Sequence, residues 1–91
     1  MVKGLRRTAK IVNSKGLHAR AAAKICKVAE KFDAEILISK GELEVSSGSI
    51  MGLLMLAAAQ ESEIQLSATG AEAEKAMDVI CKLIAGGFNE D

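Results

Sequence analysis

The sequence contains no tryptophan, tyrosine or proline, and its only aromatic residues are Phe32 and Phe88. Because hydrophobic residues still make up 49% of the 91 residues, the core must be built mainly from Ala, Ile, Leu, Val and Met side chains. A chain of this length buries roughly 60% of the surface that it exposes when unfolded, which supports one core without disulfide bonds. We therefore expect residues 1–91 to form a single domain.

An excess of charge of either sign is also absent, since twelve Lys and Arg residues balance twelve Asp and Glu residues. Proteins that bind nucleic acid depend on clustered positive charge, so nucleic acid is not an expected partner. Cys26 and Cys81 lie far apart and form no C-x-x-C pair, and we expect neither a metal nor a cofactor. The two cysteines are expected to be small buried hydrophobic residues, with a disulfide between them as the alternative.

No apolar stretch is long enough to cross a bilayer. The longest one, Ile50 to Ala59, is about half the required length and contains Gly52. The basic segment Met1 to Arg7 is not followed by an apolar stretch of signal-peptide length. We therefore expect a cytoplasmic protein, a monomer, that does not insert into membranes.

The periodicity of apolar residues predicts the order strand, helix, strand, strand, helix, strand, helix. Predicted strands alternate in polarity at every second residue, and predicted helices place apolar residues three or four positions apart. The strands are expected at 8–13, 34–39, 42–46 and 63–68, and the helices at 19–32, 50–59 and 71–85. Because three of the strands have one polar face, the helices should all cover the opposite face. This predicts an α+β open-faced two-layer sandwich with a four-stranded antiparallel sheet and three helices on one face.

The only histidine, His18, follows a predicted turn and immediately precedes the first predicted helix. The first amides of a helix have no partners within it, so they can bind a phosphoryl group carried by the preceding side chain. Arg20 adds a planar cation that can contact two phosphate oxygens. The spacing alone leaves two interpretations open, a phosphoryl site or two polar surface residues.

A second candidate region begins at Ser49, whose hydroxyl can cap the short helix that follows it. Ile50, Met51 and Leu54 are too many large apolar residues for so short a helix to bury. We expect Met51 and Leu54 to be exposed near His18 as a protein-docking patch, the alternative being that the core contains all of them.

The segment Gly16-Leu17-His18-Ala19-Arg20-Ala21-Ala22 resembles the active-site motif of the HPr phosphocarrier family, G-L-H-[AT]-R-P-A. The segment Ser49-Ile50-Met51-Gly52-Leu53 is similar to the family's regulatory serine and the helix after it. The resemblance implies that His18 accepts a phosphoryl group on Nδ1 from phospho-Enzyme I, with Arg20 beside it, and passes it to an Enzyme IIA. It also implies phosphorylation of Ser49 by an HPr kinase/phosphorylase. The partner-binding surface would include Ala19, Ile50, Met51 and Leu54.

Two positions depart from the family pattern. Ala21 replaces the family's proline, although alanine is a strong helix former and can occupy the same backbone. Gly48 stands where many relatives have a basic residue before the serine. We expect the site to survive the first change, with a helix start that frays more.

The resemblance implies a carrier rather than an independent catalyst, and two alternatives remain. A small acylphosphatase-like hydrolase would need an arginine-bearing phosphate loop and an asparagine that positions water, and no such loop is evident. A regulatory relative would instead signal by contacts that phosphorylation of His18 controls. The sequence does not distinguish a role in carbon metabolism from one in nitrogen metabolism, nor does it identify the Enzyme IIA.

Overall fold

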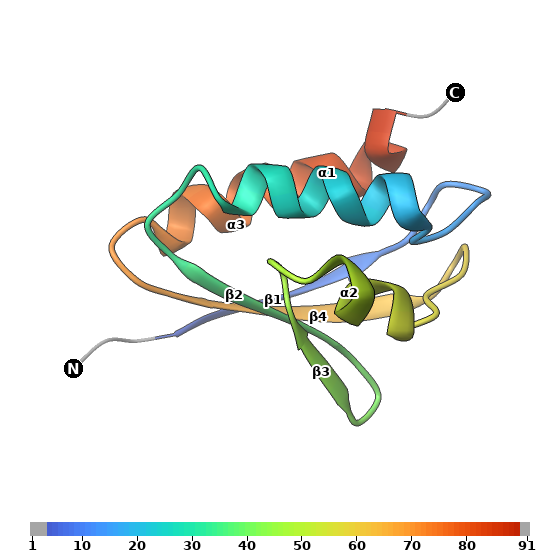
Figure 1. Cartoon of the computed structure of the whole chain (residues 1–91), viewed down its shortest axis with the longest axis horizontal. Coiled ribbons are helices and arrows are strands. Elements are labelled where there is room, and N and C mark those ends of the chain that lie inside the picture. Colours follow the sequence, from blue (N-terminus) through green and yellow to red (C-terminus); the bar gives the residue numbers. More distant parts are fainter. Residues whose placement is uncertain (1–3, 90–91) are drawn as a thin grey trace.

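The strands and helices follow one another in the predicted order (Figure 1). The structure, a computed structural model, describes residues 4–89. The strands are β1 (Leu5–Lys10), β2 (Glu35–Lys40), β3 (Leu43–Ser46) and β4 (Glu63–Thr69). The helices are α1 (Ala19–Ala29), α2 (Ile50–Met55) and α3 (Ala73–Ala85), followed by the short 3-10 helix η1 (Gly87–Asn89).

The four strands form one antiparallel sheet in the order β1-β4-β2-β3. The two central strands, β4 and β2, carry the most deeply buried side chains of the sheet. Ile38 of β2, for example, pairs with Leu66 of β4 on one side and with Val45 of β3 on the other. Their neighbours along each strand point to the opposite, polar face, as the alternation predicts.

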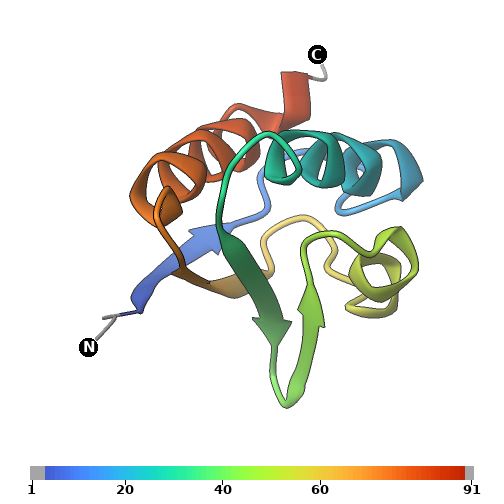
Figure 2. The ribbon, with the colours of Figure 1, turned by 60° about the vertical axis from the view of Figure 1, so that its left-hand side comes forward.

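The helices lie on one side of this sheet, which confirms the predicted open-faced sandwich. Figures 1 and 2 show α1 and α3 side by side above the strands, while the other face of the sheet is left open. The shorter α2 lies near β3 and packs against both β3 and α1. The N-terminal end of α1 and the whole of α2 therefore lie at the same end of the molecule.

The core fills the space between the sheet and the helices and is almost entirely aliphatic, as the lack of aromatic residues predicts. The stripe predicted for α3 is buried, namely Ala73, Met77, Ile80 and Ile84. Phe88 in η1 is the one fully buried aromatic side chain among residues 4–89. Its carbonyl accepts a hydrogen bond from the Lys24 ammonium, which ties the end of the chain to α1.

Four predicted boundaries were wrong by three residues or more. The first strand begins at Leu5 and not at residue 8. It ends at Lys10 and not at residue 13, because the Ser62 N–H turns back to the Ala59 carbonyl and the Ile11 carbonyl accepts from the Glu61 N–H instead. The first helix ends at Ala29, after which the chain tightens into i→i−3 turns. The middle helix ends at Met55 because Ala57 adopts a left-handed backbone with φ 50°.

The two cysteines are free thiols, and both are only partly buried, so the prediction of small buried hydrophobic residues was correct in part. Between residues 4 and 89, no helix combines the length and the apolar character needed to span a membrane.

Candidate functional site

The loop that joins β1 to α1 is held in place by a buried asparagine and a glycine. The Asn13 side chain donates from Nδ2 to the Gly16 carbonyl at 2.9 Å, and the Gly16 N–H donates to the Asn13 carbonyl at 3.2 Å. Leu17 is buried, and its N–H donates to the Ala58 carbonyl at 2.8 Å. The residue after Leu17 is therefore presented from a fixed base and not from a mobile loop.

Gly16 is required at its position by two independent features of the backbone. Its φ of 68° lies in the left-handed region, where a side chain is strained. A Cβ atom there would also lie 2.6 Å from the Ala58 carbonyl oxygen, which is backbone and cannot move aside by itself. The absence of a side chain at Gly16 therefore lets the loop lie close to the segment after α2.

His18 is the N-cap residue of α1. Its backbone is extended, its carbonyl accepts the hydrogen bond from the Ala22 N–H at 2.8 Å, and its Nδ1 accepts one from the Arg20 N–H at 3.3 Å. A nitrogen that accepts a hydrogen bond carries a lone pair and no proton, so this geometry assigns the nucleophilic lone pair to Nδ1. The ring is partly exposed.

The environment of Nδ1 favours an anion. The amides of Ala19, Arg20 and Ala21 come before the first i→i−4 hydrogen bond of α1, which is made by Ala22. The first turn carries no acidic side chain, so nothing in it neutralises the positive end of the helix. α1 begins at Ala19 with Ala21 in its first turn and fully buried, so the helix start forms without the family's proline.

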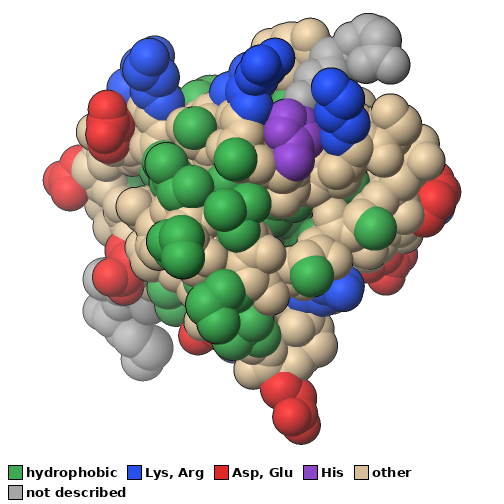
Figure 3. All heavy atoms as spheres, turned by 45° about the vertical axis from the view of Figure 1, so that its right-hand side comes forward, with side chains coloured by type: hydrophobic (Ala, Val, Ile, Leu, Met, Phe, Trp, Pro, Cys, Tyr) green, Lys and Arg blue, Asp and Glu red, His purple; other side chains and the backbone are tan. Residues whose placement is uncertain are grey.

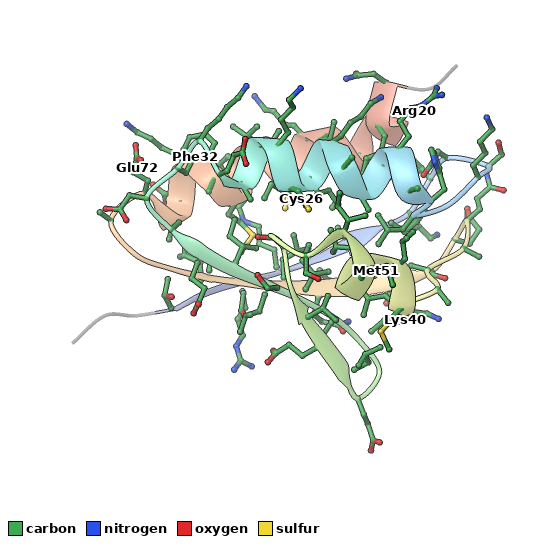
Figure 4. The ribbon with its side chains drawn as sticks, viewed as in Figure 1. Arg20, Cys26, Phe32, Lys40, Met51 and Glu72 are labelled. Carbon is green, nitrogen blue, oxygen red and sulfur yellow. The ribbon has the colours of Figure 1, made fainter. Side chains whose placement is uncertain are left out.

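Arg20 is exposed in the same turn, and Figure 4 shows its side chain extending from α1 on the side away from the sheet. Figure 3 shows lysine and arginine side chains on both sides of the single histidine. The surface around Nδ1 is therefore positively charged, while the ring itself stays open to solvent.

An exposed apolar patch on α2 lies on the same face as the histidine (Figure 3). Met51 is 71% exposed and Ile50 is 42% exposed, as expected for a docking surface. The expectation that Leu54 is exposed was wrong in part. Leu54 is half-buried and packs against the core, because α2 lies against both α1 and β3. Met55, which is 66% exposed, contributes the third exposed side chain of the patch.

Ser49 caps α2 as expected. Its Oγ accepts a hydrogen bond from the Gly52 N–H at 3.0 Å, and its carbonyl accepts one from the Leu53 N–H at 3.0 Å. The side chain is partly exposed at the edge of the α2 patch. The hydroxyl is thus accessible and lies beside the exposed apolar residues.

Two contributors to this site were not predicted. Asn13 was placed at the end of the first strand, although its amide braces the loop, and a polar residue shortly before a glycine is the only signal that it left in the sequence. Met55 was not assigned to the patch, although its spacing of four residues from Met51 puts both on one face of a helix.

Comparison with known proteins gives one consistent result. Residues 5–86 match the family model described as PTS HPr component phosphorylation site. The chain is 45% identical over 86 residues to the phosphocarrier protein NPr of Shewanella violacea, with 94% of each chain covered. It is 42% identical over 86 residues to the phosphocarrier protein HPr of Neisseria meningitidis, with 94% of this chain and 97% of that protein covered. A crystal structure of HPr from Thermoanaerobacter tengcongensis superposes with a TM-score of 0.90 at 37% identity, covering 96% of this chain and 98% of that one.

Proposed function

The chain belongs to the HPr family of phosphocarrier proteins of the phosphotransferase system, and from this premise we propose that His18 is the residue that carries the phosphoryl group. Phospho-Enzyme I is the proposed donor and an Enzyme IIA the proposed acceptor. The observation that supports this most is the Nδ1 lone pair of a partly exposed ring at the start of α1. Because a carrier must meet two partners in turn, we also propose that it works as a cytoplasmic monomer of one domain.

The proposed transfer uses the groups already in place. The Nδ1 lone pair attacks the phosphorus atom of phospho-Enzyme I, a nitrogen–phosphorus bond forms, and the bond to Enzyme I breaks with its electron pair returning to Enzyme I. The Arg20 N–H, which donates to Nδ1 in the free protein, then faces the phosphoryl oxygens. The Arg20 guanidinium offers further donors to the same oxygens. Transfer to an Enzyme IIA reverses these steps with a new acceptor.

The proposal is tested by incubating the chain with radiolabelled phosphoenolpyruvate and purified Enzyme I, and then adding Enzyme IIA proteins of both the sugar and the nitrogen branch. We expect one acid-labile phosphoryl group per chain, which moves to an added Enzyme IIA. Label that no Enzyme IIA accepts would favour the regulatory alternative. Hydrolysis of acetyl phosphate by the chain alone would favour the acylphosphatase-like one.

Replacing Met51 by aspartate should weaken docking without weakening the fold. The side chain is 71% exposed, so the change has little effect on the free protein. When a partner binds, the variant loses apolar contact area and places a charge in the interface. We expect the KM for phosphorylation by Enzyme I to rise about 10-fold, a loss of about 1.4 kcal/mol of binding, with little change in Tm. Val79→Asp, on the exposed side of α3, is the matched control and should keep the wild-type KM. Unchanged kinetics in Met51→Asp would remove α2 from the docking surface.

We also propose that Ser49 is phosphorylated by an HPr kinase. About two negative charges added beside the α2 patch should then lower the rate of phosphorylation by Enzyme I. Mass spectrometry after incubation with kinase and ATP should find phosphate on Ser49 in the wild type and in Ser46→Ala, and none in Ser49→Ala. The last variant should also lose about 1 kcal/mol of stability, because it loses the cap of α2. Phosphate on any other residue would refute the assignment.

A further inference from the structure

The turn η1, directly after α3, has a backbone conformation that the end of the helix does not explain. Gly87, Phe88 and Asn89 have successive φ values of 66°, 59° and 61°, all in the left-handed region. A glycine in this region is common just after a helix. A phenylalanine there is strained, because left-handed backbone is unfavourable for a residue with a large side chain. Such a conformation persists only where the surrounding structure holds it.

Two contacts of Phe88 hold the turn. Its ring is fully buried in the core between the sheet and the helices. Its carbonyl accepts a hydrogen bond from Nζ of Lys24, which lies in the second turn of α1. A hydrogen bond from an ammonium group is stronger than one between neutral groups. The turn is therefore attached to the helix whose N-cap residue is His18.

The same turn packs beside the loop that presents His18. A Cβ atom at Gly87 would lie 3.6 Å from Asn13 Cβ and 3.8 Å from Val12 Cγ2, which are ordinary van der Waals distances. Asn13 is the residue whose side-chain amide fixes this loop. Figure 1 shows η1 at the end of the molecule where the chain passes from β1 into α1. The turn therefore borders the segment before His18 and binds, through Lys24, the helix after it.

We propose that Phe88 is a positioning residue for phosphotransfer by His18, an inference that rests on the proposed carrier function. The buried ring fixes η1, and η1 keeps the loop before His18 and α1 in one relative orientation. That orientation decides whether the free amides at the start of α1 point at a phosphoryl group on Nδ1. Phe88 cannot act by touching Enzyme I, because its side chain has no exposed surface.

The first test measures amide hydrogen exchange in the ¹⁵N-labelled protein without Enzyme I. The N–H groups of Gly16 and Leu17 are hydrogen-bonded to Asn13 and Ala58, so their exchange reports local opening of the loop. We expect these two amides to exchange about 10-fold faster in Phe88→Leu and in Lys24→Met, relative to the amides of β4. Lys24→Met keeps the length of the side chain and removes the donor, so this variant does not disturb the core.

Two matched variants separate positioning from a general loss of stability. Lys27→Met changes an exposed lysine on the same helix, and its loop exchange should equal that of the wild type. Ile36→Val shortens a core side chain at the opposite end of the sheet, in line with the first residue of β1, whereas the loop follows the last one. Its loop amides and β4 amides should change by the same factor or not at all. Wild-type loop exchange in both test variants would overturn the proposal.

The second test measures the kinetics of phosphorylation by phosphoenolpyruvate and Enzyme I. In Phe88→Leu we expect kcat to fall about 3-fold with an unchanged KM, because the docking surface is intact and only the position of His18 changes. Met51→Asp should raise KM instead, and Ile36→Val should keep both wild-type values. A raised KM with wild-type kcat in Phe88→Leu, or wild-type kinetics despite faster loop exchange, would rule out the positioning role. Label that persists in His18→Asn would refute the carrier function and leave the exchange result unaffected.

Discussion

Replacing His18 by asparagine is expected to abolish phosphorylation by phosphoenolpyruvate and Enzyme I while leaving the fold intact. The substitution removes the only imidazole in the chain, and with it the lone pair that attacks phosphorus, so the rate of labelling should fall by more than about 10³-fold. Asparagine is a good N-cap residue, because its side-chain oxygen can accept the Arg20 N–H that His18 Nδ1 accepts now. The Tm should therefore stay close to that of the wild type.

His18→Ala separates the two roles of the side chain. Alanine removes both the nucleophile and the cap, so it should abolish labelling and also cost about 1 kcal/mol of stability. The measurements are acid-labile label per chain and the free energy of unfolding in urea for each of the three proteins. Labelling of His18→Asn at the wild-type rate would place the phosphoryl group on another residue and refute the proposed site.

The largest loss of stability is expected for Gly16→Ala. The added Cβ would lie 2.6 Å from the Ala58 carbonyl oxygen, and the residue would keep a φ of 68°. A left-handed alanine costs about 1 kcal/mol or more, and the displaced backbone adds an overpacking cost of about 1–3 kcal/mol. The free energy of unfolding should therefore fall by about 2–4 kcal/mol, and the Tm by about 10 °C or more.

Gly41→Ala is the matched control for this prediction. Gly41 has nearly the same φ, 62°, but a Cβ atom there would meet no atom within 4 Å. It should lose only about 1 kcal/mol and keep the wild-type rate of phosphotransfer. In Gly16→Ala the rate should fall as well, because Leu17 and His18 follow directly. Similar losses of stability in the two variants would show that the clash between the added Cβ atom and the Ala58 carbonyl oxygen contributes nothing to the loss in Gly16→Ala.

Some of the fold could be predicted because several segments have unambiguous periodicity. The burial of Ala73, Met77, Ile80 and Ile84 in α3 follows from helical spacing, and the alternation of β4 follows from the spacing of a strand. The strand order β1-β4-β2-β3 has no such local signal, since pairing between distant segments depends on tertiary packing. The end of α2 was missed for a related reason, because an alanine gave no indication of the left-handed backbone at Ala57.

The residues that carry the chemistry of the candidate site could be predicted, but the contacts that hold them in place could not. His18 before a helix and Ser49 as a cap could be inferred because capping involves residues close in sequence. The brace from Asn13 and the contact between Gly16 and Ala58 could not, since they depend on how the loop packs against the segment after α2. The half-burial of Leu54 likewise depends on the positions of α1 and β3.

The N-cap role of His18 has a thermodynamic consequence for a phosphorylated chain. The helix start that now donates to Nδ1 would interact with the phosphoryl oxygens more strongly than with a neutral ring, because the oxygens are charged. Folding would then lower the group-transfer potential of the phosphohistidine below its value in an unfolded peptide. The same cycle requires that phosphorylation raise the melting temperature, so a thermal scan alone would report the fraction of carrier that is loaded.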